Sequence, residues 1–547
     1  MKRILPMLAA TGLALFFSCS DETIIYEDEQ SAVELETSET VLENSISLDN
    51  AGVLDIFSED RLTGKLARFA DEPAGDYPLS LVAQVSPPKF SGGENLTASH
   101  VHVHGNYAYV AYNTVGQDYV GGIDIVNVAD PNRPRVTSRL YYTNADISSV
   151  KYDNGYVYAA GGVDSEKSVR ATSNSFVAKI KVDNGRFNLG AGILYGFQEG
   201  FVATDVETTA SSVIVTSGKD GYVTVYDKNT LEAQNDTPFS DLRSVKLKDD
   251  KIGVLDADFG VRILDQNLSQ VGSIAIDADF RTADKRTLDF TSDNKIVVSE
   301  GEAGAGIYDF TTGSFIEHVP ILINPDGVAT SDIVTNAVTI NEDVLLMANG
   351  GAGLCLSEEE DNGTDLVGII ELTGSINYVE SKGDYIFAAS GKSGLQVIKM
   401  NKPSPSLAAR CADSPNYQGS SKLTVGANQQ LAYSGSKRFQ QISVSGSLLL
   451  CGTWTVINTV TVADDALFEM RGTLIVARNN KRKDLKVGEG ATLRIEGNLT
   501  VYGDLELEDG ATVEFLGTGS RVNILGEVKK GDNVTITGDF EDIQNKF

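Results

Sequence analysis

Three histidines, His100, His102 and His104, alternate with valines and form the most conspicuous group of possible metal ligands in the sequence. On a β-strand such alternate residues share one face and lie about 7 Å apart, which suits two ligands of one metal better than three. Zinc or copper would need a further carboxylate or histidine, and the sequence identifies none. The simpler interpretation is that they are polar residues of a strand, so we expect no metal and no other cofactor.

Polar residues also recur two positions before a series of apolar residues, which we call the anchors: Val101, Val150, Val206, Val245, Leu288, Val338 and Val379. The polar residues are Ser99, Ser148, Thr204, Arg243, Arg286, Asn336 and Asn377. Such a ring of side chains, with two arginines in it, is a candidate site for an anionic or sugar-like ligand held by planar hydrogen bonds. The alternative is a water-filled channel without a specific ligand. No residue is predicted to be catalytic.

The anchors predict the elements that must carry these side chains. Successive anchors are 39 to 56 residues apart, close to the roughly 40 to 50 residues of a four-stranded propeller blade. A second β-rich run follows each anchor, and short runs bounded by Gly, Asn and Asp indicate strands rather than helices. The innermost strands of a propeller border its axial channel. Residues 79–402 are therefore predicted to form an all-β, seven-bladed β-propeller.

A propeller must also close its ring, because an unpaired last blade would leave an open strand edge. The seventh repeat lacks an outer strand, since Pro403 and Pro405 follow soon after its third β-rich run. The segment Leu79–Val85, ahead of the first anchor, has the composition of a strand. We expect it to complete the last blade and to join that blade to the first.

Two segments of the first repeat resemble a known family. Gly105-Asn-Tyr-Ala-Tyr-Val-Ala111 and Gly121-Gly-Ile-Asp-Ile-Val-Asn-Val-Ala-Asp-Pro-Asn-Arg-Pro134 are similar to the bacterial LVIVD-repeat propellers. The pattern is recognisable in the fourth and seventh repeats, although their Asp-Pro-x-x-Pro tail is missing. The resemblance covers roughly residues 79 to 402 and implies a propeller fold. Because these propellers are mostly of unknown biochemical function, it carries over no catalytic residue.

The N-terminus has the layout of a secretory signal. Lys2 and Arg3 precede an apolar run, which is shorter than the ~20 residues that a spanning helix needs. The run ends at Phe16-Phe-Ser-Cys19, which resembles a lipoprotein lipobox except that Phe16 replaces the commoner Leu. Residues 1–18 are therefore expected to be a lipoprotein signal peptide, and Cys19 the lipidated residue that holds the protein to outer-membrane lipid. An ordinary signal peptide or a membrane anchor is the alternative.

An acidic segment follows Cys19, and no Lys or Arg lies between Ser20 and Asp60. A stretch of one charge sign repels itself, so residues 19–78 are expected to form an extended tether. Acidic residues directly after a lipidated cysteine resemble the surface-export signal of Bacteroidota lipoproteins. That resemblance implies an outer-membrane protein exposed at the cell surface; a periplasmic protein with a solvated linker is the alternative.

The charge balance excludes one class of partner. The chain of 547 residues has a formal net charge of −31 and a pI near 4.5. Nucleic-acid binding depends on clustered Lys and Arg facing phosphates, so we expect no nucleic-acid partner.

A second and shorter repeat occupies residues 421–547, after a linker at 403–420. It consists of an aliphatic residue, five residues of any kind, an apolar, any, an apolar, any, and Gly. It fits Val425–Gly435, Val462–Gly472, Val487–Gly497, Leu507–Gly517 and Val528–Gly538. Successive starts are 20 to 37 residues apart, about one coil of a β-solenoid. The sequence predicts a β-solenoid-like domain, with a small β-sandwich as the alternative.

The cysteines permit one disulfide. With Cys19 assigned to lipid, Cys411 and Cys451 in the C-terminal part would pair in an oxidising compartment. The alternative is that both are buried free thiols. Cys355 is then a lone cysteine of a blade, and no two cysteines have the spacing of a zinc site.

Two functions from different classes remain open at this stage. In the first, the protein is a non-enzymatic binding or scaffold module at the cell surface, with a protein or glycan partner. In the second, the propeller is a hydrolase or lyase acting on a polysaccharide, with an acid and a base among its many carboxylates. The sequence contains no recognisable catalytic constellation, and for that reason we favour the first.

Overall fold

The computed structural model describes residues 32–48, 52–53, 56–60, 65–68, 79–89, 96–114, 119–278, 280, 285–321, 327–341, 344–360, 363–370, 372–400, 406–412, 414–517 and 519–547. The chain divides into two compact units, Met1–Asn401 and Lys402–Phe547. The predicted signal peptide and Cys19 lie outside the described residues. No helix among the described residues is long and apolar enough to cross a membrane.

Antiparallel sheets make up the first unit, and we divide them into four-stranded blades, each named by its innermost strand. The β7 blade contains β7 (Thr97–His104), β8 (Tyr107–Asn113), β9 (Gly121–Asn127) and β10 (Arg135–Tyr142). The β11 blade contains β11 (Ala145–Asp153), β12 (Tyr156–Val163), β13 (Ser175–Asp183) and β15 (Ile193–Gln198), with β14 (Arg186–Phe187) and the short helix η1 (Leu189–Ala191) between the last two. The β16 blade contains β16 (Asp205–Thr208), β17 (Ser212–Thr216), β18 (Gly218–Asp227) and the first part of β19 (Ala233–Lys248).

The strand β19 is shared by two blades. Its residues up to Leu242 pair with β18, and its residues from Leu242 onward pair with β20. One strand of 16 residues is therefore both the outer strand of the β16 blade and the inner strand of the next. That next blade, the β19 blade, is completed by β20 (Lys251–Asp256), β21 (Gly260–Leu264) and β22 (Gln270–Ala275).

The remaining blades repeat the same order. The β23 blade contains β23 (Leu288–Phe290), β24 (Lys295–Ser299), β25 (Ala305–Asp309) and β26 (Phe315–Val319). After the short helix η2 (Thr330–Asp332), the β27 blade contains β27 (Ile333–Asn341), β28 (Val344–Gly350), β29 (Leu354–Glu360) and β30 (Gly363–Ile370). The β31 blade contains β31 (Tyr378–Lys382), β32 (Tyr385–Ala389) and β33 (Leu395–Met400).

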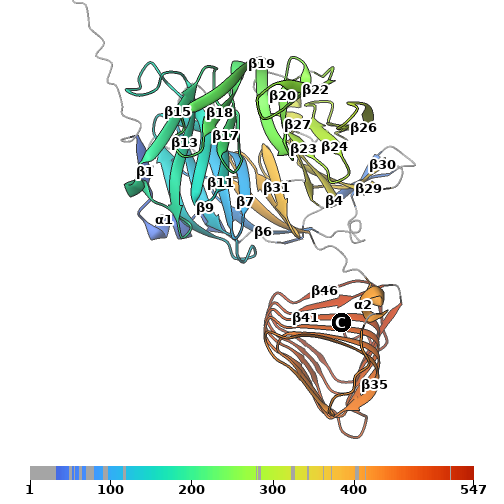
Figure 1. Cartoon of the computed structure of the whole chain (residues 1–547). Helices are drawn as coiled ribbons and strands as arrows, with labels where there is room; N and C mark the ends of the chain where they lie inside the picture. The colour runs from blue at the N-terminus through green and yellow to red at the C-terminus, as the bar shows by residue number, and fades with distance from the viewer. Residues whose placement is uncertain are drawn as a thin grey trace, which may run out of the picture. The chain divides into compact units, whose positions relative to one another are not determined.

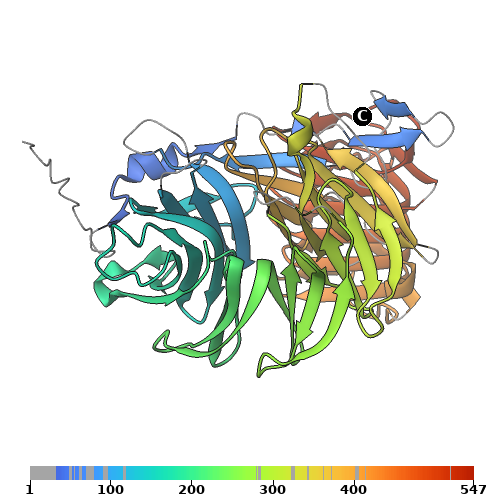
Figure 2. The same ribbon diagram turned by 90° about the horizontal axis from the view of Figure 1, so that it is seen from above.

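The inner strands form a closed ring. Each contacts the inner strand of the following blade, and β31 contacts β7. In Figure 2 the blades follow one another around a common centre in chain order. The segment Leu79–Val85 is strand β6, which pairs antiparallel with β33 and completes the last blade. The predicted closing strand is therefore confirmed, and the first unit is a β-propeller.

The residues just ahead of the ring differ from the extended tether that the acidic composition predicts. They form β1 (Val33–Leu35), α1 (Glu39–Glu43), β2 (Ile46–Ser47), β3 (Gly52–Val53), β4 (Ile56–Asp60) and β5 (Lys65–Arg68). These strands extend the outer edges of three blades, because β1 pairs with β10, β2 and β3 pair with β6, and β4 pairs with β30. Figure 1 shows α1 and β1 against the β7 blade and β4 beside β29 and β30. Unpaired outer edges can accept further strands, which charge repulsion alone does not prevent.

A buried ion pair connects this N-terminal segment to the ring. We call the segment, the described residues between 32 and 68, the N-terminal belt. Arg139 on β10 donates from Nε and Nη2 to the two carboxylate oxygens of Asp124, each at 2.7 Å. The same guanidinium donates to Ser45 Oγ in the belt and to the carbonyl of Ser86 behind β6. One side chain thus links the first blade, the closing strand and the belt.

The second unit is a β-solenoid of about six turns, residues 422–542, built from parallel sheets. One sheet contains β34 (Lys422–Val425), β36 (Gln441–Val444), β38 (Val460–Val462), β40 (Leu485–Val487), β42 (Leu505–Leu507) and β45 (Val528–Lys530). The other contains β35 (Gln430–Phe439), β37 (Ser447–Val456), β39 (Leu467–Val476), β41 (Thr492–Val501), β43 (Thr512–Phe515), β44 (Ser520–Ile524), β46 (Thr535–Thr537) and β47 (Phe540–Asp542). The parallel coils are visible in Figure 1.

Glycines stack at one corner of the coils. Gly435, Gly452, Gly472 and Gly497 pair in register, each with a φ between 117° and 129°. A Cβ on Gly472 would lie 2.3 Å from the carbonyl oxygen of Gly452. These positions require glycine both for the positive φ and for the close approach of the next coil.

One coil of the solenoid does not fit the repeat pattern found in the sequence. The widest spacing, between Val425 and Val462, contains β36 and β37, whose glycine is Gly452. In this coil the turn between the two strands is two residues shorter than the repeat requires, since Gly452 follows Val444 by eight residues instead of ten. A pattern of fixed length cannot detect a coil with a shortened turn.

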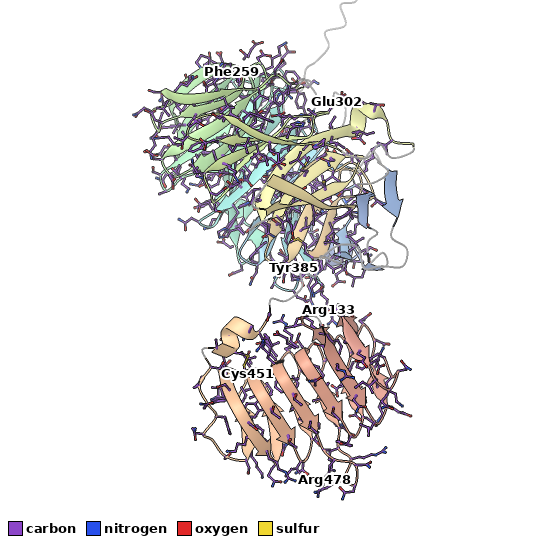
Figure 3. All side chains as sticks on the ribbon, turned by 90° about the vertical axis from the view of Figure 1, so that its right-hand side faces the viewer. Arg133, Phe259, Glu302, Tyr385, Cys451 and Arg478 are labelled. Atoms are coloured by element: carbon purple, nitrogen blue, oxygen red, sulfur yellow. A yellow bond between two sulfur atoms is a disulfide. The ribbon has the colours of Figure 1, made fainter. Side chains whose placement is uncertain are left out.

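Cys411 and Cys451, the pair that the sequence analysis singled out, are joined by a disulfide. Cys411 lies on the short helix α2 (Ala408–Ala412), and Figure 3 shows Cys451 on the solenoid near this helix. Leu407 packs with the cysteines in a small apolar cluster, and Arg410 pairs with Glu469 at 2.6 Å. The helix is thereby fixed to the outer face of the coils.

Candidate functional site

The predicted ring of polar side chains connects neighbouring blades. Hydrogen bonds run from Ser99 Oγ to the Ile147 carbonyl, from Thr204 Oγ1 to the Leu242 carbonyl, from Asn336 Nδ2 to the Ile376 carbonyl and from Asn377 Nδ2 to the Ala98 carbonyl. Every acceptor lies three residues before the anchor of the next blade. These four side chains of the ring therefore join neighbouring blades.

A β-bulge explains why the Ser99 side chain points to the next blade, and the same bulge recurs in two other blades. The register of strand pairing shifts at Ser99, Ser148 and Arg243. Each of these residues lies two positions before an anchor, and the shift falls between its two neighbours in the strand. A bulge inserts one extra residue into the strand and turns its side chain away from the regular alternation. Sequence spacing alone does not reveal this change of direction.

The two arginines of the ring are also engaged within the protein. Arg243 Nη2 donates to Asp241 Oδ2 at 2.7 Å in the same strand. Arg286 is fully buried and donates from Nη1 to Asn336 Oδ1 at 3.0 Å in the next blade. Both guanidinium groups therefore contact other residues of the propeller, and the ligand-binding role predicted for them stays a prediction.

The titratable residues one before and one after the anchors form a second set, which lies on the inner strands of the blades. We call it the axial cluster, with one residue from the start of the β23 blade added: His100, His102, Lys151, Asp205, Glu207, Lys246, Lys285, Asp289, Tyr378 and Glu380. The strands β7, β11, β16, β19, β23 and β31 supply all its members except Lys285, which precedes β23. The charges of Lys285, Lys246 and Lys151, three different blades, each act on the pKa of His100, so these groups converge.

The carboxylates of the axial cluster accept hydrogen bonds from neighbouring blades. Asp205 accepts from Ser149 Oγ at 2.7 Å and from the Val245 amide at 3.1 Å. Asp289 accepts from Thr339 Oγ1, and Glu380 accepts from the Val103 amide. Their acceptor capacity is largely used in holding adjacent blades together.

Glu207 is bound by lysines on both sides. Lys151 lies 2.8 Å and Lys246 3.7 Å from its oxygens. Although burial would raise the pKa of Glu207, these lysines lower it below the usual value. The pKa of Lys246 is raised, first by Tyr378 and then, against burial, by Glu207, Asp289 and Glu380. Glu207 and Lys246 are therefore both charged at neutral pH.

Lys285 crosses the ring. It precedes β23, yet its Nζ donates to the carbonyl of Ser148 on β11 at 3.0 Å and lies 5.1 Å from the centre of the Tyr378 ring on β31. Burial lowers the pKa of this amine to about 8, with Asp205 opposing the shift and Lys246 adding to it. A lysine with a pKa this close to neutrality is a candidate functional group.

The histidines are dispersed along the axis. His100 Nδ1 accepts from the Val150 amide at 3.4 Å, and its ring lies 3.9 Å from that of Tyr378. His102 Nδ1 lies 3.4 Å from Glu380, and His104 packs beside Tyr152. Within the described part of the chain, no three His, Cys, Asp or Glu side chains form a group that could hold a metal ion. The three histidines are polar residues of an inner strand.

Sequence reasoning missed Lys285, although a signal was present. The other residues three before an anchor are Ala98, Ile147, Ala203, Leu242, Thr335 and Ile376. Lysine is the exception in that row. A comparison of this position between repeats would have identified it.

One family model matches part of the propeller. A family model described as the LVIVD repeat matches residues 97–139, which span the β7 blade. No curated protein matches the chain. Among solved structures, the WD40 β-propeller domain of Doa1 is 13% identical with a TM-score of 0.42, covering 58% of this chain and 96% of that one. The RRP9 WD40 repeats are 12% identical with a TM-score of 0.43, covering 58% of this chain and all of that one.

Proposed function

We propose that this LVIVD-repeat β-propeller is a lipid-anchored binding or scaffold module of the outer membrane, exposed at the cell surface, with a protein or glycan as its partner. The propeller supplies a rigid platform, and the solenoid supplies a second one. Chemistry on a bound substrate is not part of the proposal.

The observation that carries the proposal is the use of polar groups between blades. Asp205, Asp289 and Glu380 each accept hydrogen bonds from a neighbouring blade. A glycosidase needs one carboxylic acid and one carboxylate that both face the scissile bond. Carboxylates that hold blades together serve rigidity, which favours binding over a hydrolase or lyase activity.

Anchoring rests on the sequence of the N-terminus. Cys19 follows a short apolar run with a lipobox-like ending, and acidic residues follow it directly. Since β1 begins at Val33, only a short stretch separates Cys19 from the first strand of the belt. We therefore expect the propeller to be held close to the membrane surface.

Binding is tested by capture of partners on intact cells. Full-length protein carrying an affinity tag at its C-terminus would be cross-linked, purified and examined for co-purifying protein and glycan. The same preparation would be incubated with polysaccharides and assayed for new reducing ends. A specific captured partner without cleavage supports the proposal, and cleavage that a single Asp or Glu substitution abolishes overturns it.

Location is tested with the variant Cys19→Ser. We expect the natural protein in the outer-membrane fraction and its release by protease added to intact cells, whereas the variant should lose its membrane association. Protection of the natural protein from external protease would place it in the periplasm instead.

A further inference from the structure

We propose that the axial cluster binds a small carboxylate, with the Lys285 ammonium as its principal contact and Lys246, Tyr378 and His100 as neighbouring donors. The inference rests on the proposed binding function and names the ligand class of one site within it. The ligand chemistry is a carboxylate on a small molecule, whether from an acidic sugar or from the end of a peptide.

In the axial cluster, more acceptors than donors are already hydrogen-bonded within the protein. The carboxylates Asp205, Asp289 and Glu380 are engaged by amides and side chains of adjacent blades. Lys285, in contrast, has hydrogen-bonding capacity for three acceptors, and the one hydrogen bond found for it in the described structure goes to the Ser148 carbonyl. Lys246 lies 3.7 Å from Glu207, beyond hydrogen-bonding distance. The groups left to recognise a ligand are therefore mainly donors.

His100 is a further donor in the axial cluster. Burial, followed by the charge of Lys285, lowers its pKa well below the ordinary value, so the ring is neutral. Its Nδ1 accepts a hydrogen bond from the Val150 amide, and a neutral imidazole then carries its proton on Nε2. His100 thereby adds one more donor beside Tyr378, whose ring centre is 3.9 Å away.

A separate observation points to a missing polar partner. Nε2 of His102 is buried and has no hydrogen-bond partner among the described residues, while only 9% of the residue is exposed. Its other ring nitrogen faces Glu380. Buried polar atoms are almost always paired, and an exception needs a water, an ion or a ligand to explain it.

Charge limits the ligand to one negative charge. Lys151, Lys246 and Lys285 stand against Asp205, Glu207, Asp289 and Glu380, so the cluster has three positive and four negative side chains. Close to the starts of the inner strands, Arg243 pairs with Asp241, and Arg286 is hydrogen-bonded to Asn336. The cluster therefore has no positive charge in excess. A carboxylate adds a single charge, whereas a phosphate dianion would add two against the buried carboxylates.

Lys285 is also the member best placed to meet a ligand. It lies three residues before its anchor, near the start of the inner strand, and the residue as a whole is only partly buried. The groups that face it are His100, Asp205, Lys246 and Tyr378. Because an anion favours the protonated amine, affinity should be highest below the pKa of about 8 and fall above it.

The test is calorimetric titration of the full protein at pH 7 with sodium glucuronate, with glucose as the neutral partner of the same ring size. A second arm uses a tripeptide with a free C-terminus against its C-terminal amide, which distinguishes the two sources of carboxylate. We expect binding of at least one carboxylate, no binding of its neutral partner, and a loss of affinity as pH rises from 7 to 9.

The matched variants are Lys285→Met, which keeps the apolar stem, and Lys251→Met at a hairpin turn, where Lys251 pairs with Asp250. We expect Lys285→Met to weaken binding about tenfold or more, as for the loss of one charge-assisted hydrogen bond, and Lys251→Met to leave it unchanged. Tyr378→Phe, which removes only the hydroxyl, gives a second and milder measure in case Lys285→Met disturbs the fold.

The inference is overturned if no carboxylate binds, or if binding is equal in Lys285→Met and the natural protein. Should captured partners persist in that case, the binding function stands and only the assignment of the ligand fails. Should glucuronate bind through Lys285 while a longer uronate polymer is cleaved, the ligand site stands and the non-enzymatic function fails.

Discussion

Arg139 and Asp124 form a bidentate ion pair at the seam of the propeller, with both hydrogen bonds at 2.7 Å and side-chain exposures of 3% and 0%. Tyr112 Oη donates to the same carboxylate at 3.1 Å. Because Arg139 also contacts Ser45 and the Ser86 carbonyl, this pair joins segments that are far apart in the sequence.

Arg139→Met should strongly destabilise the propeller. The substitution leaves the Asp124 carboxylate buried without its cation, and breaking a buried pair in this way costs about 3–5 kcal/mol. The measurement is the free energy of unfolding in urea, followed by circular dichroism. The double variant Arg139→Met with Asp124→Leu removes both charges and should recover much of the loss; an equal or greater loss in the double variant would contradict this explanation.

Asn377→Ala tests the hydrogen bonds between blades where the ring closes. Asn377 Nδ2 donates at 2.8 Å to the carbonyl of Ala98, a fully buried residue of the first blade. Losing a partner of a buried carbonyl should lower the free energy of unfolding by about 1–3 kcal/mol. Asn132→Ala, which removes an exposed hydrogen bond to Tyr385, is the control and should have little effect.

Gly472→Ala tests the stacked corner of the solenoid. Its Cβ would meet the Gly452 carbonyl at 2.3 Å, and its φ of 117° is strained for any other residue. We expect a loss of about 1–3 kcal/mol in the unfolding of the second unit. Gly426→Ala is the matched control, since its φ is not positive and the nearest atom, at 3.4 Å, belongs to the flexible Gln429 side chain. Equal effects of both variants would show that the corner has no special requirement for glycine.

Removing the disulfide should loosen α2 from the solenoid. The bond joins residues 40 apart, and loss of a disulfide of this kind costs about 2–4 kcal/mol. The double variant Cys411→Ala with Cys451→Ala should lower the unfolding temperature of the second unit, and the natural protein in reducing agent should match it. A variant that still responds to reducing agent would mean that another thiol is responsible.

Lys285 predicts a dependence of stability on pH. Its pKa is about 8 in the folded protein and about 10.4 in an unfolded chain. Between these values the unfolded chain binds more protons, so this group makes stability rise with pH across that window. Lys285→Met lacks the effect and should be more stable than the natural protein at pH 7.5, by a margin that shrinks at pH 10. Urea unfolding at both pH values measures the margin, and a constant margin would refute the assignment.

The architecture was largely predictable because the buried apolar residues recur at similar intervals along the sequence. All the anchors, from Val101 to Val379, lie in inner strands, since each blade must bury one apolar residue at that place. The closing strand at Leu79–Val85 was predictable for the same reason. Blade number remains the expectation of the sequence, supported by the ring of inner strands.

The candidate site was less predictable, because contacts between blades depend on geometry that spacing does not record. Ser99 and Arg286 were expected to face a ligand, but one bonds to the next blade and the other is fully buried. The belt at residues 32–68 was also missed. The acidic composition of the belt predicts charge repulsion within it. It does not predict that these residues pair with the open outer strands of the blades.

The continuity of β19 limits how the chain can be cut and rejoined. Most neighbouring blades are connected through a turn or a loop, where new termini or an inserted domain would leave both sheets intact. Between the β16 and β19 blades the strand continues from one sheet into the other at Leu242 without a turn or a loop. A circular permutant opened at that point would lose an outer strand and an inner strand at once, so permutants opened there should fail to assemble while those opened at other junctions survive.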